Sequence, residues 1–335
     1  MRRMLFITSS RIGDGVITTG LLGQLLEQVE AVTIVASPHN ARLFAAVPKL
    51  EHLIVLHKRR ASRHWLDLWW RVVWRRWDCV VDCRGSAIGW FLWTNCRLAH
   101  RQGRGRIPKV AQLGALIGRA EHPPLPRLWL EPARVAAAAR AMAGQRYLAV
   151  APTTNWPGKE WSMANYIELL RRITAANGIF AGYRIAVFSA PSERSRLTPL
   201  WQAFSPEQCF DGSTDADLQQ VAANLAQCAY FVGNDSGLMH MAAALGVRTL
   251  GLFGPSDELV YAPAGVAADL VRSPISCSEL HRRRIEFGDL DLMRDLTIEQ
   301  VEFGLKRLRA RGDVIAPPGQ GRPDPMPFSG SGGGS

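Results

Sequence analysis

The sequence predicts an α/β protein built from two consecutive Rossmann-like halves that face each other across a cleft. A length of 335 residues suits about two domains. Short β-rich runs alternate with helical patterns along the whole chain, which indicates parallel sheets with helices on both faces. A joint with three prolines in seven residues, 121–127, separates the two series. We therefore expect an N-terminal domain over 1–130 and a C-terminal domain over 131–312.

The first half carries four expected strands with helical patterns between them. Each strand is a short run dominated by apolar and β-branched residues, as a strand buried inside a parallel sheet requires. The expected strands are Met4–Thr8, Val32–Ala36, His52–Leu56 and Cys79–Asp82. Helical patterns cover 15–29, 39–47 and 64–77.

An alanine-rich helical segment, 132–143, leads into the second βα series. Its expected strands are Tyr147–Ala151, Arg184–Ser189, Tyr230–Gly233 and Thr249–Phe253, with helices near 162–175, 191–203, 215–226 and 236–245. A last amphipathic helix, 297–311, is assigned to the second domain and could also pack back on the first. Residues 313–335 are rich in glycine and proline, so we expect a disordered tail or an appended linker there.

Charge and cysteine usage narrow the class of protein. The chain has 40 Lys and Arg residues against 29 Asp and Glu, a net charge of +11, which favours an anionic partner. Nucleic acid, a membrane surface and a phosphorylated substrate all fit, and a GC-rich genome would also enrich arginine. The six cysteines show no C-x-x-C spacing, which is typical of a reducing compartment. No signal-peptide core and no membrane-spanning stretch is present, so we expect a cytoplasmic protein, at most peripheral on a membrane.

The first candidate motif joins the first strand to the first helix, at the sheet edge where ligands bind in open α/β folds. It places Ser9, Ser10, Gly13 and Asp14 at that edge. Gly13 permits a tight turn, and Asp14 brings a carboxylate to the rim of the cleft. The alternative is that Asp14 only caps the helix. The segment is not G-x-G-x-x-G, so it is no dinucleotide fingerprint.

The second candidate motif follows the first strand of the second half. Thr153 and Thr154 offer hydroxyl groups, and Lys159 is the sole lysine between 110 and 305. In a chain dominated by arginine, a lysine in such a loop hints at contact with a phosphate or a developing charge. The alternative is an exposed lysine beside Ser162, which caps the next helix.

The third motif gives the strongest signal. A strand ends in a polar turn with Asp235, Ser236 and Gly237, and a helix of small residues begins at once. Backbone N–H groups at such a helix start bind anions, and the glycine lets a phosphate approach. His240 lies one helical turn further, where it faces the same ligand. The alternative for His240 is an ordinary buried histidine.

A tryptophan- and arginine-rich segment, 58–77, stands apart from these motifs. It carries five of the eleven tryptophans, preceded by Lys58, Arg59, Arg60 and Arg63. Aromatic residues next to basic ones suit a membrane interface or stacking on single-stranded nucleic acid. The alternative is a helix buried on the sheet with its arginines reaching solvent. The segment's place in the first half favours lipid over nucleic acid.

Taken together, the motifs resemble glycosyltransferase family 9, the family of the lipopolysaccharide heptosyltransferases. The shared features are the Gly-Asp turn at 13–14, a Lys-x-Trp segment at 159–161, and Asp-Ser-Gly-x-x-His at 235–240 followed by Phe-Gly-Pro-Ser-Asp at 253–257. Residues 184–194 resemble the family's strand with a glutamate turn, and 77–86 resemble its acceptor-domain strand. The resemblance covers roughly 1–310. The family's cysteine-rich C-terminal segment is reduced to Cys277.

The resemblance implies a GT-B fold, with the acceptor in the first domain and a nucleotide-sugar in the second. It implies an inverting, metal-independent transferase with no cofactor, in which Asp14 is the general base and Lys159 neutralises the departing diphosphate. The implied donor-binding residues are Thr153, Thr154, Glu193, Asp235, Ser236, Gly237 and His240. The implied acceptor-side residues are Ser9, Ser10, Gly13 and Arg84.

These features lead to one function and two alternatives. The expected reaction moves a sugar, a heptose from ADP-heptose, onto a lipopolysaccharide core or related lipid-linked or phosphorylated glycan. The expected location is the cytoplasm, with contact to the anionic inner face of the membrane, and nucleic acid is not an expected partner. One alternative is a non-catalytic basic module that binds anionic lipid or nucleic acid. The other is a nucleotide-sugar epimerase of GT-B type, which would need no acceptor.

Overall fold

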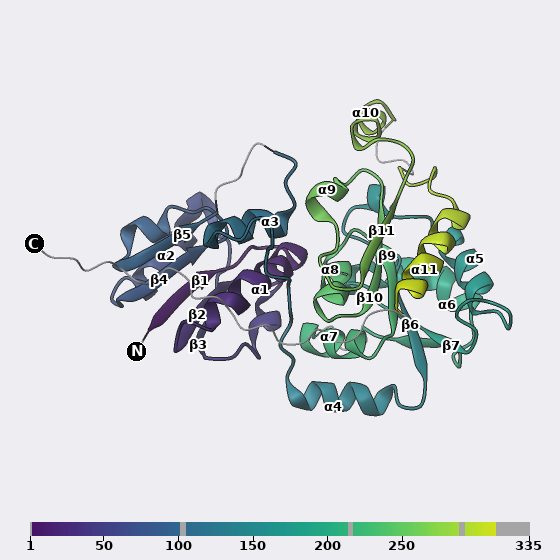
Figure 1. Ribbon diagram of the computed structural model, residues 1–335, viewed down its shortest axis with the longest axis horizontal. Coiled ribbons are helices and arrows are strands. Elements are labelled where there is room, and N and C mark those ends of the chain that lie inside the picture. The colour runs from purple at the N-terminus through teal and green to yellow at the C-terminus, as the bar shows by residue number, and fades with distance from the viewer. Residues whose placement is uncertain (1, 101–104, 214–216, 288–291, 313–335) are drawn as a thin grey trace, which may run out of the picture.

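The computed structural model describes residues 2–100, 105–213, 217–287 and 292–312 and contains two β-sheets in separate lobes (Figure 1). The first sheet has the strand order β3-β2-β1-β4-β5, and the second has the order β11-β10-β9-β6-β7-β8. Neighbouring strands run parallel throughout both sheets. The predicted α/β class with two Rossmann-like halves is confirmed.

The described residues of the first lobe form five strands and three α-helices. Its strands are β1 (Arg3–Ile7), β2 (Ala31–Ala36), β3 (Leu50–Val55), β4 (Trp77–Asp82) and β5 (Thr94–Ala99). Its helices are α1 (Ile12–Leu26), α2 (Arg63–Val72) and α3 (Lys109–Gly114). The polypeptide then crosses to the second lobe, whose first helix, α4 (Pro132–Ala141), packs against α7.

The second lobe contains the remaining elements. Its strands are β6 (Arg146–Ala151), β7 (Tyr183–Val187), β8 (Cys209–Asp211), β9 (Tyr230–Asn234), β10 (Arg248–Phe253) and β11 (Ala268–Arg272). Its other helices are α5 (Met163–Thr174), α6 (Thr198–Ala203), α7 (Leu218–Ala226), α8 (Gly237–Ala244), α9 (Glu258–Tyr261), α10 (Cys277–Phe287) and α11 (Ile298–Gly312).

The central strands match the sequence prediction because they are continuous apolar runs. The β1 residues Met4 to Ile7 are fully buried. The strands absent from the prediction, β5, β8 and β11, are the short or edge strands of the two sheets. The edge strands β5 and β11 carry polar residues and lack the apolar signature. Asn95 of β5 is exposed, and Asp269 of β11 pairs with Arg307 of α11.

Three predicted helices are shorter or of another type. The pattern at 39–47 forms only a 3₁₀ turn, Ala41–Phe44, because the Asn40 carboxamide hydrogen-bonds Ser37 and competes with helical pairing. The pattern at 191–203 divides into a 3₁₀ helix, Pro191–Leu197, and α6, with Pro199 in the first turn of α6. Helix α2 ends at Val72 rather than residue 77, because Trp77 already belongs to β4.

The last helix, α11, packs on the second sheet and not back on the first domain. Its residues Val301, Leu305 and Leu308 are buried in the core of the second lobe. Gly304 permits this packing, since a Cβ atom there would stand 2.5 Å from Val271. The Arg307 guanidinium also donates to Asp269 of β11 at 2.6 Å. The expectation that this helix could return to the first domain was therefore wrong.

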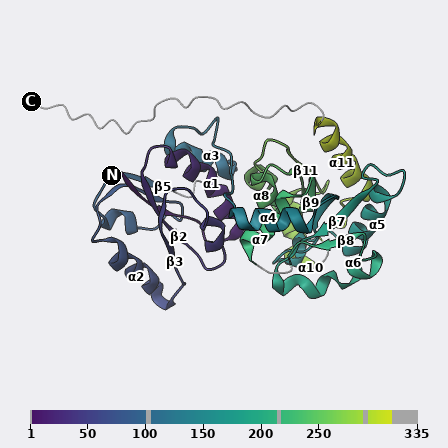
Figure 2. The same ribbon diagram turned by 90° about the horizontal axis from the view of Figure 1, so that it is seen from below.

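The two lobes meet where α1 of the first contacts α8 of the second, and both views place these helices at the junction (Figures 1 and 2). Each helix begins directly after a central strand of its own sheet, β1 for α1 and β9 for α8. The carboxyl ends of the central strands of both sheets therefore face the same region of the molecule. Most of the predicted site residues lie in this region.

Candidate active site

The turn between β1 and α1 is held by hydrogen bonds from the loop that follows the neighbouring strand β2. The Asn40 side chain donates to the carbonyl of Ser9 at 2.7 Å, and the Ser37 hydroxyl donates to the carbonyl of Ser10 at 2.6 Å. Both partners follow β2, the strand beside β1. Predicted acceptor-side residues Ser9 and Ser10 therefore form a fixed loop at the sheet edge.

Asp14 lies in the first turn of α1 but does not cap it. Arg11 occupies the N-cap position, and no side-chain capping hydrogen bond forms there. Within the described part of the chain, the half-buried Asp14 carboxylate has no hydrogen bond or ion pair. The alternative that Asp14 is only a helix cap is therefore wrong, and its carboxylate is free to accept a proton or a hydrogen bond.

Opposite Asp14, the start of α8 is anchored by Asn234, a fully buried residue at the end of β9. Its amide nitrogen donates to the carbonyl of Pro152 at 2.8 Å. Its carboxamide oxygen accepts from the backbone of Trp161 at 3.0 Å and from the Tyr166 hydroxyl at 3.1 Å. Asn234 thus ties the loop 152–161, which carries Lys159, to the start of α8.

Asp235 connects two other predicted residues. Its Oδ2 atom lies 2.6 Å from the Lys159 ammonium, and its Oδ1 atom lies 3.8 Å from Nε2 of His240. The side chains of Asp235 and His240 are only 8% and 5% exposed, and that of Lys159 is 26% exposed. Lys159 is therefore not a loosely solvated surface lysine, which removes the alternative considered for it.

Two glycines bring the starts of α1 and α8 into direct contact. A Cβ atom on Gly13 would stand 2.9 Å from Cδ2 of His240, and one on Gly237 would stand 2.8 Å from Cγ2 of Ile12. Both distances are below any normal carbon contact, so neither position accepts a side chain without movement. The N-terminal ends of two helices, with their positive dipole ends, thus meet at one place.

The charges at this junction act on one another. Burial lowers the pKa of His240 below its ordinary 6.5, opposed by the negative charges of Asp235 and Asp14. Burial raises the pKa of Tyr261 in α9, with the charges of Asp14 and Asp235 contributing in the same direction. Asp14 of the first lobe therefore shares one electrostatic environment with Asp235, His240 and Tyr261 of the second. Burial therefore favours the neutral form of His240.

The predicted residues Thr153, Thr154 and Glu193 form a buried network beside this junction. The Thr153 hydroxyl donates to Glu193 Oε2 at 2.9 Å, and the Thr154 backbone donates to Glu160 Oε1 at 2.6 Å. Arg196 joins both carboxylates, pairing with Glu160 and lying 3.8 Å from Glu193 Oε1. The Ser236 hydroxyl caps α8 by accepting a hydrogen bond from the Met239 backbone at 3.5 Å. The side chains of Thr153, Glu193 and Ser236 thus hold the loops around the junction in shape.

On the first lobe, Arg84 follows β4 and is tied to the same loop as Ser9. Its Nε atom donates to the carbonyl of Thr8 at 2.7 Å. Its Nη2 atom is buried without a hydrogen-bond partner in the described structure, and burial lowers the pKa of the guanidinium. Asp82 accepts from the Arg84 backbone at 2.8 Å and from the Ser86 hydroxyl at 2.6 Å. Arg84 is thus a positioned cation with a donor to spare.

Several residues of the junction were absent from the sequence prediction. Asn234 has a local signal, since it stands between the strand and Asp235. Glu160, Arg196 and Tyr261 have no such signal, because the pairing of Arg196 with Glu160 and the nearness of Tyr261 to Asp14 join positions far apart in the chain. No cluster of three or more His, Cys, Asp or Glu side chains suited to a metal ion occurs among the residues that the structure describes. No described helix is both long and apolar enough to cross a bilayer.

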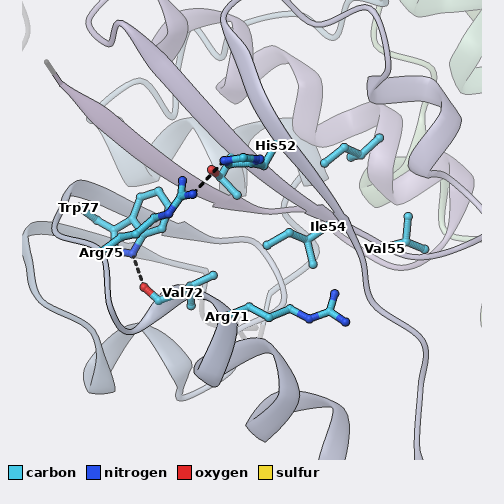
Figure 3. A pocket seen from close by; sticks show the side chains of 9 residues that line it. His52, Ile54, Val55, Arg71, Val72, Arg75 and Trp77 are labelled. Atoms are coloured by element: carbon cyan, nitrogen blue, oxygen red, sulfur yellow. Dashed lines mark hydrogen bonds between the residues drawn. The ribbon is translucent and has the colours of Figure 1, made fainter.

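A pocket of ≈ 390 Å³ lies elsewhere, between α2 and the strands β2 and β3 (Figure 3). It is lined by Thr33, Ile54, Arg71, Arg75 and Trp77, among others, and the Arg75 guanidinium bonds His52 at 2.9 Å. None of the predicted site residues lines it. The junction of α1 and α8, which gathers the predicted residues of both lobes, is the better candidate for chemistry.

Two parallel-sheet lobes that meet at their strand ends define a GT-B protein, the class in which a donor site and an acceptor site face each other. Within that class, the model of glycosyltransferase family 9 (heptosyltransferase) matches residues 104–289. The chain belongs to this family. The matched range contains Lys159, Asp235 and His240, whereas Asp14 lies outside it.

Individual relatives agree with this assignment. Lipopolysaccharide heptosyltransferase 2 of Salmonella typhimurium is 31% identical over 148 residues, covering 43% of this chain and 41% of the relative. The chain is thus aligned with less than half of that relative's length. A family 9 glycosyltransferase from Veillonella parvula has a TM-score of 0.76 at 15% identity, covering 92% of this chain and 97% of that one. The E. coli ADP-heptose lps heptosyltransferase II has a TM-score of 0.73 at 20% identity, covering 93% and 100%.

Proposed function

We propose that this protein is an inverting, metal-independent glycosyltransferase that moves a heptose from ADP-heptose onto a lipopolysaccharide core or a related glycan. One observation carries the proposal. The unpaired Asp14 carboxylate shares the junction with the Lys159–Asp235–His240 cluster of the other lobe. A base on one lobe and a lysine ammonium on the other are what transfer between two bound substrates requires.

Asp14 is the general base in this proposal. Its carboxylate takes the proton of the acceptor hydroxyl as that oxygen attacks the anomeric carbon of the donor, and the bond from that carbon to the diphosphate breaks. A single displacement inverts the configuration at the anomeric carbon. The lack of a partner for Asp14 in the described structure supports this role, because a carboxylate held in an ion pair is a weaker base.

Lys159 and the start of α8 stabilise the departing diphosphate. The ammonium is a compact point charge, and the N–H groups at the start of α8 point toward the same junction. Asp235 holds Lys159 in place and, since a carboxylate repels phosphate, accepts a hydrogen bond from a sugar hydroxyl. Neutral His240 adds an uncharged ring at the sugar end of the site.

The remaining predicted residues divide between the two substrates. Thr153, Thr154 and Glu193 form the wall of the donor site beside Lys159, with Ser236 and Gly237 at its floor. Ser9, Ser10 and Gly13 line the acceptor side. The spare Nη2 donor of Arg84 suits a phosphate or carboxylate on the acceptor. We propose the domain limits 1–130 and 131–312 for these two functions.

The test uses the full chain, ADP-heptose and a purified core acceptor, with release of ADP and mass of the glycan as readouts. Parallel reactions with GDP- and UDP-sugars establish the donor. Transfer that depends on Asp14 supports the proposal. Donor binding without any release of ADP would indicate a non-catalytic module, and isomerised sugar in the absence of acceptor would indicate an epimerase; either result would overturn the proposal.

A further inference from the structure

Helix α2 leaves an unusual set of apolar side chains in water. Six such side chains are between 62% and 74% exposed. They are Leu66 and Trp70 of α2, Trp74 in the turn after it, Trp90 and Phe91 of the 3₁₀ helix Ile88–Phe91 that follows β4, and Trp93 just before β5. Exposed apolar side chains are normally scattered, and a group of this kind marks a binding surface. We call these six residues the aromatic ridge.

Contacts link the α2 part of the ridge to the segment that carries Phe91. The opposite side of α2, His64, Leu68 and Val72, packs on the first sheet, so Leu66, Trp70 and Trp74 face outward at the same helical spacing. The Trp70 and Trp74 rings lie edge to face at 5.3 Å. Trp69, whose ring is 6.0 Å from that of Trp70, donates its indole N–H to the carbonyl of Phe91 at 3.1 Å.

The charge around the ridge is almost entirely positive. Segment 58–76 contains one acid, Asp67, and that acid is already paired with Arg59 at 2.7 Å. Arg76 and Arg97 lie over the rings of Trp93 and Trp90, at 5.6 and 5.8 Å. Three exposed arginines have no acidic partner within the described residues: Arg60, Arg63 and Arg71. The partner of this surface must therefore be both apolar and anionic.

We propose that the aromatic ridge and its arginines dock the protein on the surface of an anionic lipid bilayer. Tryptophan prefers the boundary between acyl chains and headgroups, and arginines beside it attract anionic lipids. Figure 2 shows α2 at the rim of the first lobe, away from the second lobe. The exposed side chains of Leu66, Trp70 and Trp74 can therefore meet a membrane surface. A nucleic acid would instead need a groove that follows its backbone.

The ridge also connects to the candidate active site. Trp65, near the start of α2, lies 5.8 Å from the guanidinium of Arg84, which is tied to the loop before α1. An acceptor anchored in the same bilayer would have its sugars beside Arg84 and Asp14. This reason for docking rests on the proposed function, whereas the docking itself does not.

The experiment measures co-sedimentation of the full chain with vesicles of phosphatidylcholine alone and of phosphatidylcholine mixed with phosphatidylglycerol. We expect binding only to the anionic vesicles, weakened by salt, with a blue shift of tryptophan fluorescence. The double variant Trp70→Ser/Trp74→Ser should partition at least about tenfold more weakly, as should Arg60→Gln/Arg63→Gln/Arg71→Gln. Phe303→Ser is the matched control, since Phe303 is 64% exposed on α11.

Three results would overturn the inference. They are equal binding to both kinds of vesicle, binding that survives both ridge variants, and ridge variants that abolish instead a dimer or binding to single-stranded RNA. Unchanged melting temperatures and recovery of vesicle binding by Trp70→Phe/Trp74→Phe exclude a folding defect. Transfer to a water-soluble acceptor fragment should be unaffected by the ridge variants, so loss of docking and failure of the proposed reaction are distinguishable.

Discussion

Gly13 of the first lobe lies directly against the ring of His240 in the second, so close that a Cβ atom would stand 2.9 Å from the histidine Cδ2 atom. The next residue along α1 is Asp14, and the carboxylate of Asp235 lies 3.8 Å from the same histidine. The position of Asp14 relative to Asp235 and His240 therefore depends on the close packing of these two helix ends. The first three predictions concern that arrangement.

Asp14→Asn should lower turnover by roughly 10²–10⁴, the usual contribution of a positioned general base. Stability should change by less than about 1 kcal/mol, because Asp14 makes no capping bond and loses only its interaction with the helix dipole. Donor affinity, measured by calorimetry with ADP, should persist. Glu27→Gln at the other end of α1 is the control, and an Asp14→Asn enzyme with native turnover would remove Asp14 from the mechanism.

Lys159→Met should reduce both stability and turnover. It leaves the buried Asp235 carboxylate without its ammonium partner, at a cost of about 1–3 kcal/mol in the free energy of unfolding. The double variant Lys159→Met/Asp235→Asn should regain stability but not turnover. If turnover recovered together with stability, the role of Lys159 would be structural rather than chemical.

Gly237→Ala should push the two helix ends apart, because its methyl group would stand 2.8 Å from Ile12 and 3.3 Å from the backbone nitrogen of Gly13. We expect loss of turnover with little change in ADP affinity. The double variant Gly237→Ala/Ile12→Ala should recover activity in part. Gly105→Ala, where the new atom meets only the end of the Ile107 side chain at 3.4 Å, should behave as the native protein.

Stability should decrease as the pH falls below about 6.5, in part because of His240. Burial lowers the pKa of this histidine in the folded state, so the unfolded chain binds its proton first and stability rises with pH across this range. The effect stops below the folded-state pKa, where both states are protonated. His100, whose pKa burial and Lys109 also lower, contributes in the same direction. Denaturant unfolding of His240→Gln should show a smaller slope against pH, and an unchanged slope would contradict the assignment.

Activity should survive treatment with EDTA. In the proposed reaction Lys159 and the start of α8 supply the positive charge that the diphosphate needs, so added chelator has nothing essential to remove. ADP release is measured before and after chelation. A loss of activity that Mg²⁺ or Mn²⁺ restores would show that these groups are insufficient.

The sequence by itself determined the α/β class, the two halves and the three motifs at strand ends. Those features are local, because an apolar run such as Met4–Ile7 indicates a buried strand and a glycine before a helix indicates a turn. The resemblance to family 9 also implied that residues 159, 235 and 240 serve the same substrate, and the structure brings them together because they follow β6 and β9, which are neighbours in the second sheet. Edge strands and short helices were missed, since β5 and β11 are interrupted by polar residues and lack a continuous apolar run.

Only the tertiary structure decided how the groups are used. Whether Asp14 caps α1 depends on the geometry at Arg11, and whether Lys159 is free depends on Asp235, a residue 76 positions away. The packing of α11 on the second sheet depended on a fit between Gly304 and Val271. The exposure of Trp70 and Trp74 likewise depended on which side of α2 meets the sheet. Such contacts join distant parts of the chain, so the local sequence around one residue does not identify the partner that it meets in the folded protein.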